Sequence, residues 1–166
     1  MEEHELVDMN GNKTGKILTH VEARDPDNVP KGHYIAVVGV VIINNNNEVL
    51  LQKRSRFKRD NPSKWGICGG KVDLNETTID AGVRETLEEI GIRLNKEDLN
   101  FLSMDTNEKT HFTVYYVRQD VDIDKCKLQE EELEEVKYFK IEELQYLDNE
   151  GFEWLENLKK YIIDAY

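Results

Sequence analysis

Cysteine, positive charge and long apolar runs are all scarce in this chain of 166 residues. Two cysteines, Cys68 and Cys126, are too few for a disulfide framework, so we expect free thiols in a cytoplasmic protein. The acidic N-terminus lacks the basic and apolar regions of a signal peptide, which supports the same expectation. The apolar run Tyr34–Ile43 is about half as long as a membrane helix requires, so we expect no membrane span.

Acidic side chains outnumber basic ones by 34 to 22, which gives a net charge of −12. Such a surface disfavours nucleic-acid polymers, because binding them requires Lys and Arg to neutralise phosphates. Small phosphate ligands stay compatible with it, since bound metal ions can invert the local field. The length suits one domain over residues 1–166, with a hairpin and loop at 1–32 and the core at 33–166.

Hydrophobic patterns and turn signals predict an alternation of strands and helices. A hairpin is predicted at 4–19 around Asn10-Gly11, followed by a loop with one helical turn near 21–24. Further strands are predicted at 34–43, 49–54, 65–68, 101–105, 111–118 and 136–139. Helices are predicted at 77–90, 141–146 and 152–163, and a long acidic loop at 120–135. This order predicts an α/β (α+β) fold in which helices flank both faces of a mixed sheet.

The predicted helix 77–90 has three neighbouring carboxylates on one face, those of Glu85, Glu88 and Glu89, because an α-helix turns about 100° per residue. The opposite face is expected to pack on the core through Ile79, Val83, Leu87 and Ile90. Like charges at this spacing repel, and the helix macrodipole disfavours anions near the C-terminus. The cluster therefore predicts a counter-charge.

Two kinds of counter-charge are available to these acids. Arg84 is adjacent in the sequence, and Ala81 and Gly82 are expected to leave room beside the acids for a divalent cation. Hard oxygen ligands without His or Cys indicate Mg²⁺ or Mn²⁺ rather than Zn²⁺. Gly69-Gly70 is interpreted as a turn that lets a carbonyl face a metal or a phosphate. Gly91 is the expected C-cap of the helix, and Asn75 or Thr77 its N-cap.

The segment Gly70–Ile92 resembles the signature of the Nudix hydrolases. Written as Gly-x5-Glu-x7-Arg-Glu-U-x-Glu-Glu-x-Gly-U, with U a bulky apolar residue, the pattern is matched at Gly70, Glu76, Arg84, Glu85, Glu88, Glu89, Gly91 and Ile92. Thr86 departs from it at the first U position. The N-terminal hairpin and residues 50–55 are most similar to the subgroup related to isopentenyl-diphosphate isomerase. The resemblance implies an α/β/α sandwich that hydrolyses the diphosphate of a nucleoside diphosphate linked to another group X.

The resemblance also implies roles for individual residues. Glu85 and Glu89 would be the principal metal ligands, Glu88 would bind a second metal or orient the water, and the Gly70 carbonyl would complete the site. Arg84 would hold the glutamates by ion pairing, and Glu76 would be structural. The catalytic candidates are therefore Arg84, Glu88 and Glu89. The general base stays open between Glu88, Glu89 and the acids of the loop, Glu130, Glu131, Glu132 and Glu134.

Several alternatives remain open at this stage. The basic stretch 53–64 is either a solvated loop or a phosphate-binding one, and in the second case Arg54, Lys58 and Lys64 are the candidate substrate residues. An isomerase would use Cys68, which lies two residues before Gly70. A ligand sensor would have kept the fold without catalysis. Monomer and homodimer are both compatible with the sequence, and the identity of X is not encoded in the motif.

Overall fold

The computed structural model describes residues 2–147 and 154–164. Its strands are β1 (Glu3–Val7), β2 (Lys13–Thr19), β3 (Ile35–Ile43), β4 (Glu48–Arg54), β5 (Trp65–Gly66), β6 (Cys68–Lys71), β7 (Asn100–Thr106), β8 (Thr110–Arg118) and β9 (Leu133–Lys140). The α-helices are α1 (Thr78–Ile90), α2 (Ile141–Leu144) and α3 (Trp154–Asp164). Short 3-10 turns are η1 (Glu22–Arg24), η2 (Pro26–Asn28), η3 (Lys96–Asp98) and η4 (Ile123–Lys125).

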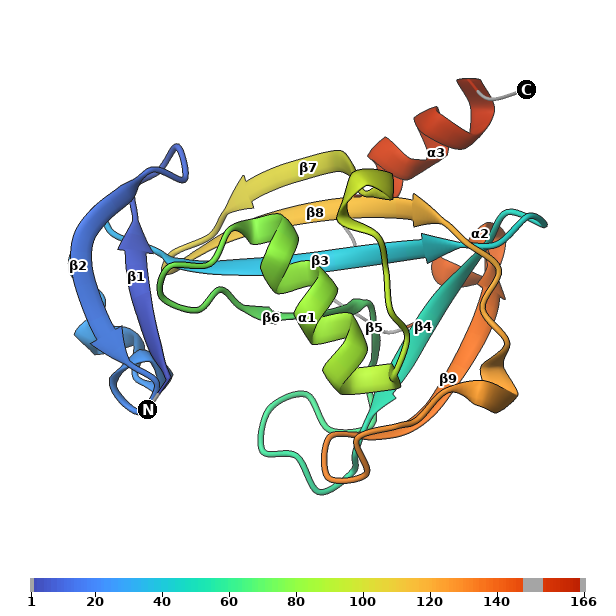
Figure 1. The fold of residues 1–166 in the computed structure, drawn as a ribbon, viewed down its shortest axis with the longest axis horizontal. Coiled ribbons are helices and arrows are strands. Elements are labelled where there is room, and N and C mark those ends of the chain that lie inside the picture. The colour runs from blue at the N-terminus through green and yellow to red at the C-terminus, as the bar shows by residue number, and fades with distance from the viewer. Residues whose placement is uncertain (1, 148–153, 165–166) are drawn as a thin grey trace.

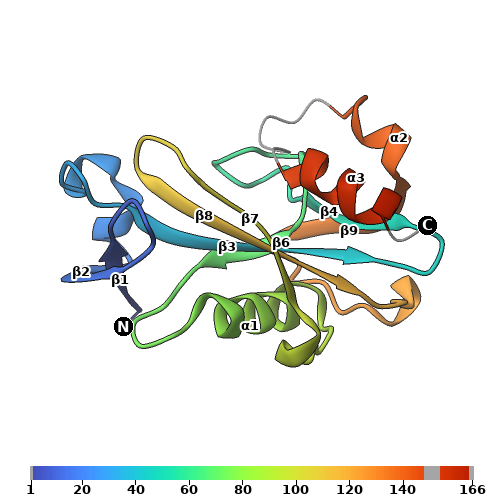
Figure 2. The ribbon, with the colours of Figure 1, turned by 90° about the horizontal axis from the view of Figure 1, so that it is seen from above.

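The main sheet is mixed and has β3 at its centre (Figure 1). Its strand order is β5-β4-β3-β8-β7, with β6 also paired to β3 and β9 paired to β4. The β3–β8 pair is parallel, whereas β3 pairs antiparallel with β4 and β6. Helix α1 covers one face of this sheet, and α2 and α3 lie on the other (Figure 2). The predicted sandwich of a mixed sheet between helices is confirmed.

Strand β3 separates two apolar clusters, because its side chains alternate between the faces of the sheet. Val38, Val40 and Ile42 point into the cluster beneath α1. Val41 and Ile43 point into the opposite cluster, where Trp154 and Leu158 of α3 pack. The near-continuous Val/Ile run of this strand is therefore buried on both sides, as its sequence predicts.

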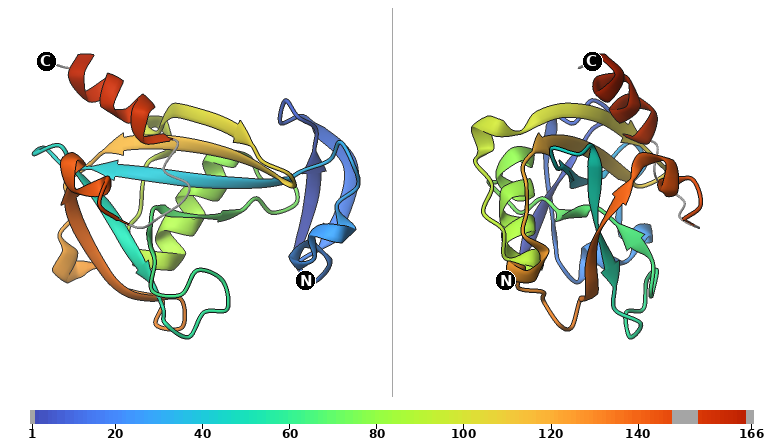
Figure 3. Two further views of the ribbon diagram at one scale, coloured as in Figure 1. Left: turned by 180° about the vertical axis from the view of Figure 1, so that it is seen from behind. Right: turned by 90° about the vertical axis from the view of Figure 1, so that its right-hand side faces the viewer.

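The N-terminal hairpin forms as predicted, and it stands beside one end of the main sheet (Figure 3). It is a separate two-stranded sheet that joins the rest through a bridge between Val7 and Tyr34. The segment that follows contains two 3-10 turns, η1 and η2, where the sequence predicts one turn of helix. This segment brings Arg24 over the edge of the main sheet near Lys71, and the two side chains line one cavity.

Most predicted boundaries hold to within one residue, but the strand predicted at 65–68 is divided into β5 and β6, and three further differences are larger or affect the site. The prediction of a turn at Gly69-Gly70 is wrong, because both glycines lie in strand β6 and pair with Gly39 and Val38 of β3. The acidic loop is shorter than predicted, since β9 begins at Leu133 and extends the predicted strand 136–139 in both directions. Helix α2 ends at Leu144 rather than at 146. The predicted start of the last helix, 152–153, lies outside the described residues. Among the described helices, none is long and apolar enough to cross a membrane.

Candidate active site

Helix α1 begins and ends as the sequence predicts. The Thr77 side chain accepts a hydrogen bond from the amide of Asp80 at 3.1 Å, which identifies Thr77 rather than Asn75 as the N-cap. Gly91 adopts a left-handed conformation with φ of 75°, and its amide bonds to the carbonyl of Leu87. A glycine tolerates this conformation at no steric cost, so the helix stops here. The caps fix where the helix begins and ends, and packing fixes which face it buries.

The buried face of α1 includes only part of the apolar stripe that the sequence predicts, because Ile90 is fully buried and Ile79 and Val83 pack partly buried against the core. The buried residues are Ala81, Gly82, Thr86, Glu89 and Ile90. Leu87 of the predicted stripe is 37% exposed. A Cβ added at Gly82 would lie 2.9 Å from Cγ2 of Val40, so the missing side chain lets the helix lie close to β3. Ala81 and Gly82 therefore provide close packing on the sheet rather than room beside the acids.

The orientation of α1 also turns Glu89, the fourth glutamate of the motif, into the protein. Glu89 is only 8% exposed, and the amide of Gly69 donates to its Oε1 at 2.9 Å. Its Oε2 accepts a close hydrogen bond from Nε2 of Gln52 on β4. Gln52 is a residue that the sequence reasoning missed, because nothing in the motif marks a contact from a strand 37 residues away.

A second carboxylate, that of the partly buried Glu85, lies against strand β6. A Cβ added at Gly70 would overlap this carboxylate, so a side chain at position 70 would have to displace Glu85. The need for glycine in the motif is therefore steric, since the strand conformation of Gly70 is accessible to other residues. The carboxylate of Glu88, by contrast, lies at the surface with its side chain 52% exposed.

Arg84 organises the acids around it. Its Nε and Nη2 donate to the two oxygens of Glu76 at 2.8 and 3.0 Å, which is a bidentate pair. Its Nη1 lies between two carboxylates, 3.0 Å from Oε1 of Glu85 and 3.2 Å from Oε2 of Glu88. Nη2 also donates to the carbonyl of Lys71 at 3.1 Å. The guanidinium thus joins the helix to the segment between β6 and α1.

Two glutamates of α1, Glu85 and Glu89, have raised pKa values and therefore keep their protons to higher pH than usual. Burial raises the pKa of Glu85 to about 7, although Arg84 beside it acts in the opposite direction. Burial likewise raises the pKa of Glu89 to about 7, against the hydrogen bonds from Gln52 and Gly69. A nearby cation favours the ionised form of a carboxylate. Hard carboxylate oxygens that lack full charge compensation fit a divalent cation such as Mg²⁺.

Some of the acids between β8 and β9 form ion pairs with the basic stretch 53–64. Nζ of Lys58 lies 2.6 Å from Oε2 of Glu132, and Nε of Arg56 lies 3.2 Å from Oε1 of Glu134. The loop touches the end of α1 through Gln129, whose amide donates to the carbonyl of Glu89. Two of the four candidate bases, Glu132 in the loop and Glu134 at the start of β9, are therefore ion-paired with the basic stretch.

A basic cavity of about 760 Å³ lies between the N-terminal segment and the loop after β4. The cations that line it are Arg24, Arg54, Lys58, Arg59 and Lys71. Arg54 and Lys58 were predicted as substrate residues, whereas Lys64, which the structure also describes, is not among the lining residues. The sequence reasoning missed Lys71, although it directly follows Gly70, and Arg24, for which the sequence carries no signal.

A comparison with protein-family models matches the NUDIX domain over residues 33–159. The chain belongs to the Nudix family. The matched range contains β3 to the start of α3, and therefore all of the acids around Arg84.

Individual Nudix proteins are similar to this chain, in sequence or in structure, over most of its length. An uncharacterized Nudix hydrolase of Listeria monocytogenes is 29% identical over 152 residues, which are 91% of this chain and 87% of that protein. A crystal structure from Deinococcus radiodurans has a TM-score of 0.72 at 20% identity and covers 96% of this chain and 98% of that one. The NUDIX domain of Shewanella oneidensis NrtR, complexed with ADP ribose, has a TM-score of 0.65 at 17% identity and covers 90% of this chain and 100% of that one.

Family membership makes this chain a Nudix hydrolase with the matching fold. Nudix hydrolases act on small-molecule diphosphates and generally use divalent metal ions.

Proposed function

We propose that this Nudix hydrolase uses Mg²⁺, or Mn²⁺ in its place, to cleave the diphosphate of a nucleoside diphosphate linked to a further group X. The supporting observation is a pair of carboxylates, the partly buried Glu85 and the buried Glu89, which lie against the glycines of β6 and have pKa values raised to about 7. Such acids are poorly compensated by the protein alone. A divalent cation supplies that compensation and, when bound, neutralises the diphosphate and acidifies the attacking water.

The protein's own groups have distinct roles in this proposal. Glu85, Glu89, Glu88 and the carbonyl of Gly70 would hold the metal. Arg84 keeps Glu85 and Glu88 in place, and Glu76 orients Arg84. The proton of the water passes to a carboxylate, Glu88 or Glu89. The raised pKa of Glu89, about 7, supports that residue, since a base with a pKa near the working pH transfers protons efficiently. Among the loop acids, Glu132 and Glu134 are less suited, because Lys58 and Arg56 pair with them.

The substrate would extend from these acids into the basic cavity. Two of its lining cations are close in the chain to groups that position the glutamates: Lys71 follows Gly70, and Arg54 lies two residues after Gln52. Arg24 adds a cation from the N-terminal segment. Arg and Lys bind phosphate oxygens by charge-assisted hydrogen bonds. The chain is strongly acidic, so this concentration of cations supports an anionic substrate at this place.

The alternative of an isomerase has weaker support. Cys68 is buried, and its Sγ donates to Oε1 of Gln52 at 3.3 Å. Burial raises the pKa of this thiol well above its usual value, so it is a poor proton donor or acceptor at neutral pH. Its size and position suit packing between β4 and α1. The alternative of a ligand sensor would leave the raised pKa values of Glu85 and Glu89 without a use.

We also propose a single domain and a cytoplasmic location for this protein. Val7 of the N-terminal hairpin packs in the cluster beneath α1, which supports one domain over 1–166. Cys68 and Cys126 are both free, which supports a cytoplasmic location.

The test is hydrolysis of a substrate panel with and without Mg²⁺, beginning with ADP-ribose, a nucleoside diphosphate sugar and dinucleoside polyphosphates. Glu89→Gln should reduce kcat by about 10³-fold or more, because the site loses a charge that acts on the reacting diphosphate. Glu97→Gln, at an exposed position of η3, is the matched control and should be neutral. Absence of metal-dependent monophosphate release from every member of the panel would reject the proposal in favour of the sensor.

A further inference from the structure

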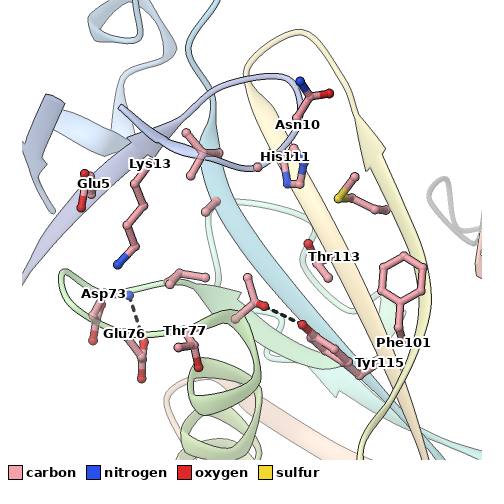
Figure 4. Close-up of a pocket in the computed structure, with 16 residues that line it drawn as sticks. Glu5, Asn10, Lys13, Asp73, Glu76, Thr77, Phe101, His111, Thr113 and Tyr115 are labelled. Atoms are coloured by element: carbon pink, nitrogen blue, oxygen red, sulfur yellow. Dashed lines mark hydrogen bonds between the residues drawn. The ribbon is translucent and has the colours of Figure 1, made fainter. Parts of the chain in front are cut away.

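A second cavity lies on the far side of the segment that enters α1. It has a volume of about 310 Å³, at the lower end of the range for small-molecule sites. Figure 4 shows that its walls come from the N-terminal hairpin, the start of α1, and strands β7 and β8. The residues that line it include none of the five cations of the basic cavity. Nothing in the proposed hydrolysis uses this space.

One buried side-chain nitrogen in the lining of this cavity has no hydrogen-bond partner among the described residues. His111, on β8, is only 3% exposed, and its Nε2 forms no hydrogen bond with any described residue. Gly11 lies so close that an added Cβ would be 3.0 Å from Cε1 of the ring, so the hairpin covers the imidazole on one side. Buried polar groups in proteins are nearly always hydrogen-bonded. The unpaired nitrogen therefore marks a position where a bound molecule would complete the site.

The apolar part of the lining is suited to a flat ring. Phe101 and Met104 are 60% and 45% exposed on strand β7, although both are large and apolar. Both line the cavity (Figure 4). The hydroxyl of Tyr115 is already bonded to Thr78 at 2.6 Å, so it does not compete for a ligand. Covering exposed apolar side chains with a ring removes them from water, which favours binding.

The charges around the cavity disfavour an anion. Three of its lining residues are acidic, Glu5, Asp73 and Glu76, and one is a cation, Lys13. Glu76 is paired with Arg84, and the amide of Asp73 donates to it at 3.0 Å. Burial lowers the pKa of His111, so the imidazole is neutral at pH 7 and offers one donor and one acceptor nitrogen. A phosphate or carboxylate would have no cationic partner here comparable to those of the basic cavity.

We propose that this cavity, which we call the His111 pocket, binds an uncharged planar heterocycle whose hydrogen-bonding edge meets Nε2 of His111 and whose ring covers Phe101 and Met104. A nucleobase-like ring carries such an edge, with a donor and an acceptor side by side. The pocket is separate from the diphosphate site, and it shares with it the segment that contains Asp73 and Glu76. The proposal is independent of the substrate of the hydrolase.

The probe for this pocket is 9-methyladenine, an uncharged base without ribose or phosphate. We expect saturable changes in the amide NMR signals of Gly11, Thr77 and His111 when it is added to the full chain without metal. Benzoate, a planar anion of comparable width, should leave these signals unchanged. Equal binding of benzoate, or shifts confined to the basic cavity, would overturn the proposal.

Two variants and a matched control locate the binding. His111→Phe keeps a ring but removes the nitrogens, and should weaken 9-methyladenine binding by about 10-fold. Met104→Ala removes apolar surface at an exposed position, where folding is not at risk, and should weaken it by about 3-fold. Met9→Ala, at an exposed methionine in the hairpin turn that does not line the pocket, should have no effect. Unchanged affinity in both pocket variants would refute the assignment.

Discussion

Arg84 and Glu76 form a bidentate ion pair across the segment that enters α1, with distances of 2.8 and 3.0 Å. The amide of Asp73 donates to the same carboxylate, so Glu76 is held from two sides. The remaining nitrogen of the guanidinium lies between Glu85 and Glu88. The position of these acids therefore depends on a residue that lies outside the helix and has no role in the chemistry itself.

Replacing Glu76 tests this dependence. Glu76→Gln removes the charge that faces Arg84 in a pair whose carboxylate is only 15% exposed. We expect the free energy of unfolding to fall by about 1–3 kcal/mol, because the guanidinium keeps its burial but loses its partner. We also expect kcat to decrease, since Arg84 loses the bidentate ion pair that orients it toward Glu85 and Glu88. Urea denaturation and steady-state kinetics measure both, and wild-type values in both would contradict the role of Glu76.

Gly70 should tolerate no side chain. In Gly70→Ala the new Cβ would overlap the carboxylate of Glu85 and displace it from the site. We expect Mg²⁺ affinity to fall by about 10-fold or more, as when the partner of a metal ligand is removed, with little change in circular dichroism. Gly66→Ala is the control, because nothing lies within 4 Å of a Cβ at that position. Isothermal titration with Mg²⁺ separates the two variants, and equal affinities would exclude the steric role.

Gly82 should set the distance between α1 and the sheet. In Gly82→Ala the added methyl lies 2.9 Å from Cγ2 of Val40. Overpacking costs about 1–3 kcal/mol, against about 1 kcal/mol gained in helix propensity, so we expect a net loss of stability. Val40→Ala removes the opposing methyl, and the double variant should regain part of that loss. Strictly additive effects in a double-mutant cycle by urea denaturation would show that the two positions do not touch.

The stability of the metal-free protein should fall as the pH rises from about 4.5 to 7. In that window the unfolded Glu85 and Glu89 have lost protons that the folded protein keeps, because their folded pKa is about 7. The free energy of unfolding therefore decreases with pH and levels off above this window. Mg²⁺ binds the ionised acids, so its stabilising effect should be larger at pH 8 than at pH 5.5.

Urea denaturation at a series of pH values, once in EDTA and once in Mg²⁺, measures how the free energy of unfolding depends on pH. The double variant Glu85→Gln/Glu89→Gln lacks both titrating groups, so its difference from the wild type isolates their contribution from that of other side chains. A difference that stays constant from pH 5 to pH 8 would mean that these two carboxyls titrate normally.

Arg24 should contribute to substrate binding from outside the motif. Arg24→Gln removes one cation of the basic cavity and should raise KM by about 3- to 10-fold at low salt, with kcat largely retained. Arg93→Gln changes an exposed arginine that does not line the cavity and serves as the control. Equal KM values for the two variants would remove the N-terminal segment from the substrate site.

Local features of the chain were predictable from the sequence. The strand at 34–43 follows from its Val/Ile run, the hairpin at 4–19 from Asn10-Gly11, and the end of α1 from Gly91. Each depends on hydrogen bonds and backbone preferences within a few residues. The motif Gly70–Ile92 likewise marked the acids and Arg84, and hence the reaction class, because these residues lie close together in the chain.

The tertiary structure decided which way those acids point. Periodicity predicted a buried stripe that includes Leu87, but Gly82 packs against Val40 and turns Glu89 inward to Gln52. That outcome depends on the fit between two surfaces, which side-chain polarity does not encode. The burial that raises the pKa of Glu89 follows from the same packing.

By itself, the sequence of this protein determined the helix, its acids and the bond that a Nudix hydrolase cleaves. Only the tertiary structure brought Arg24 beside Lys71, and covered His111 with Gly11 of the hairpin. These pairs are 47 and 100 residues apart. Contacts over such separations arise when the chain closes on itself around β3, so no local pattern of residues records them.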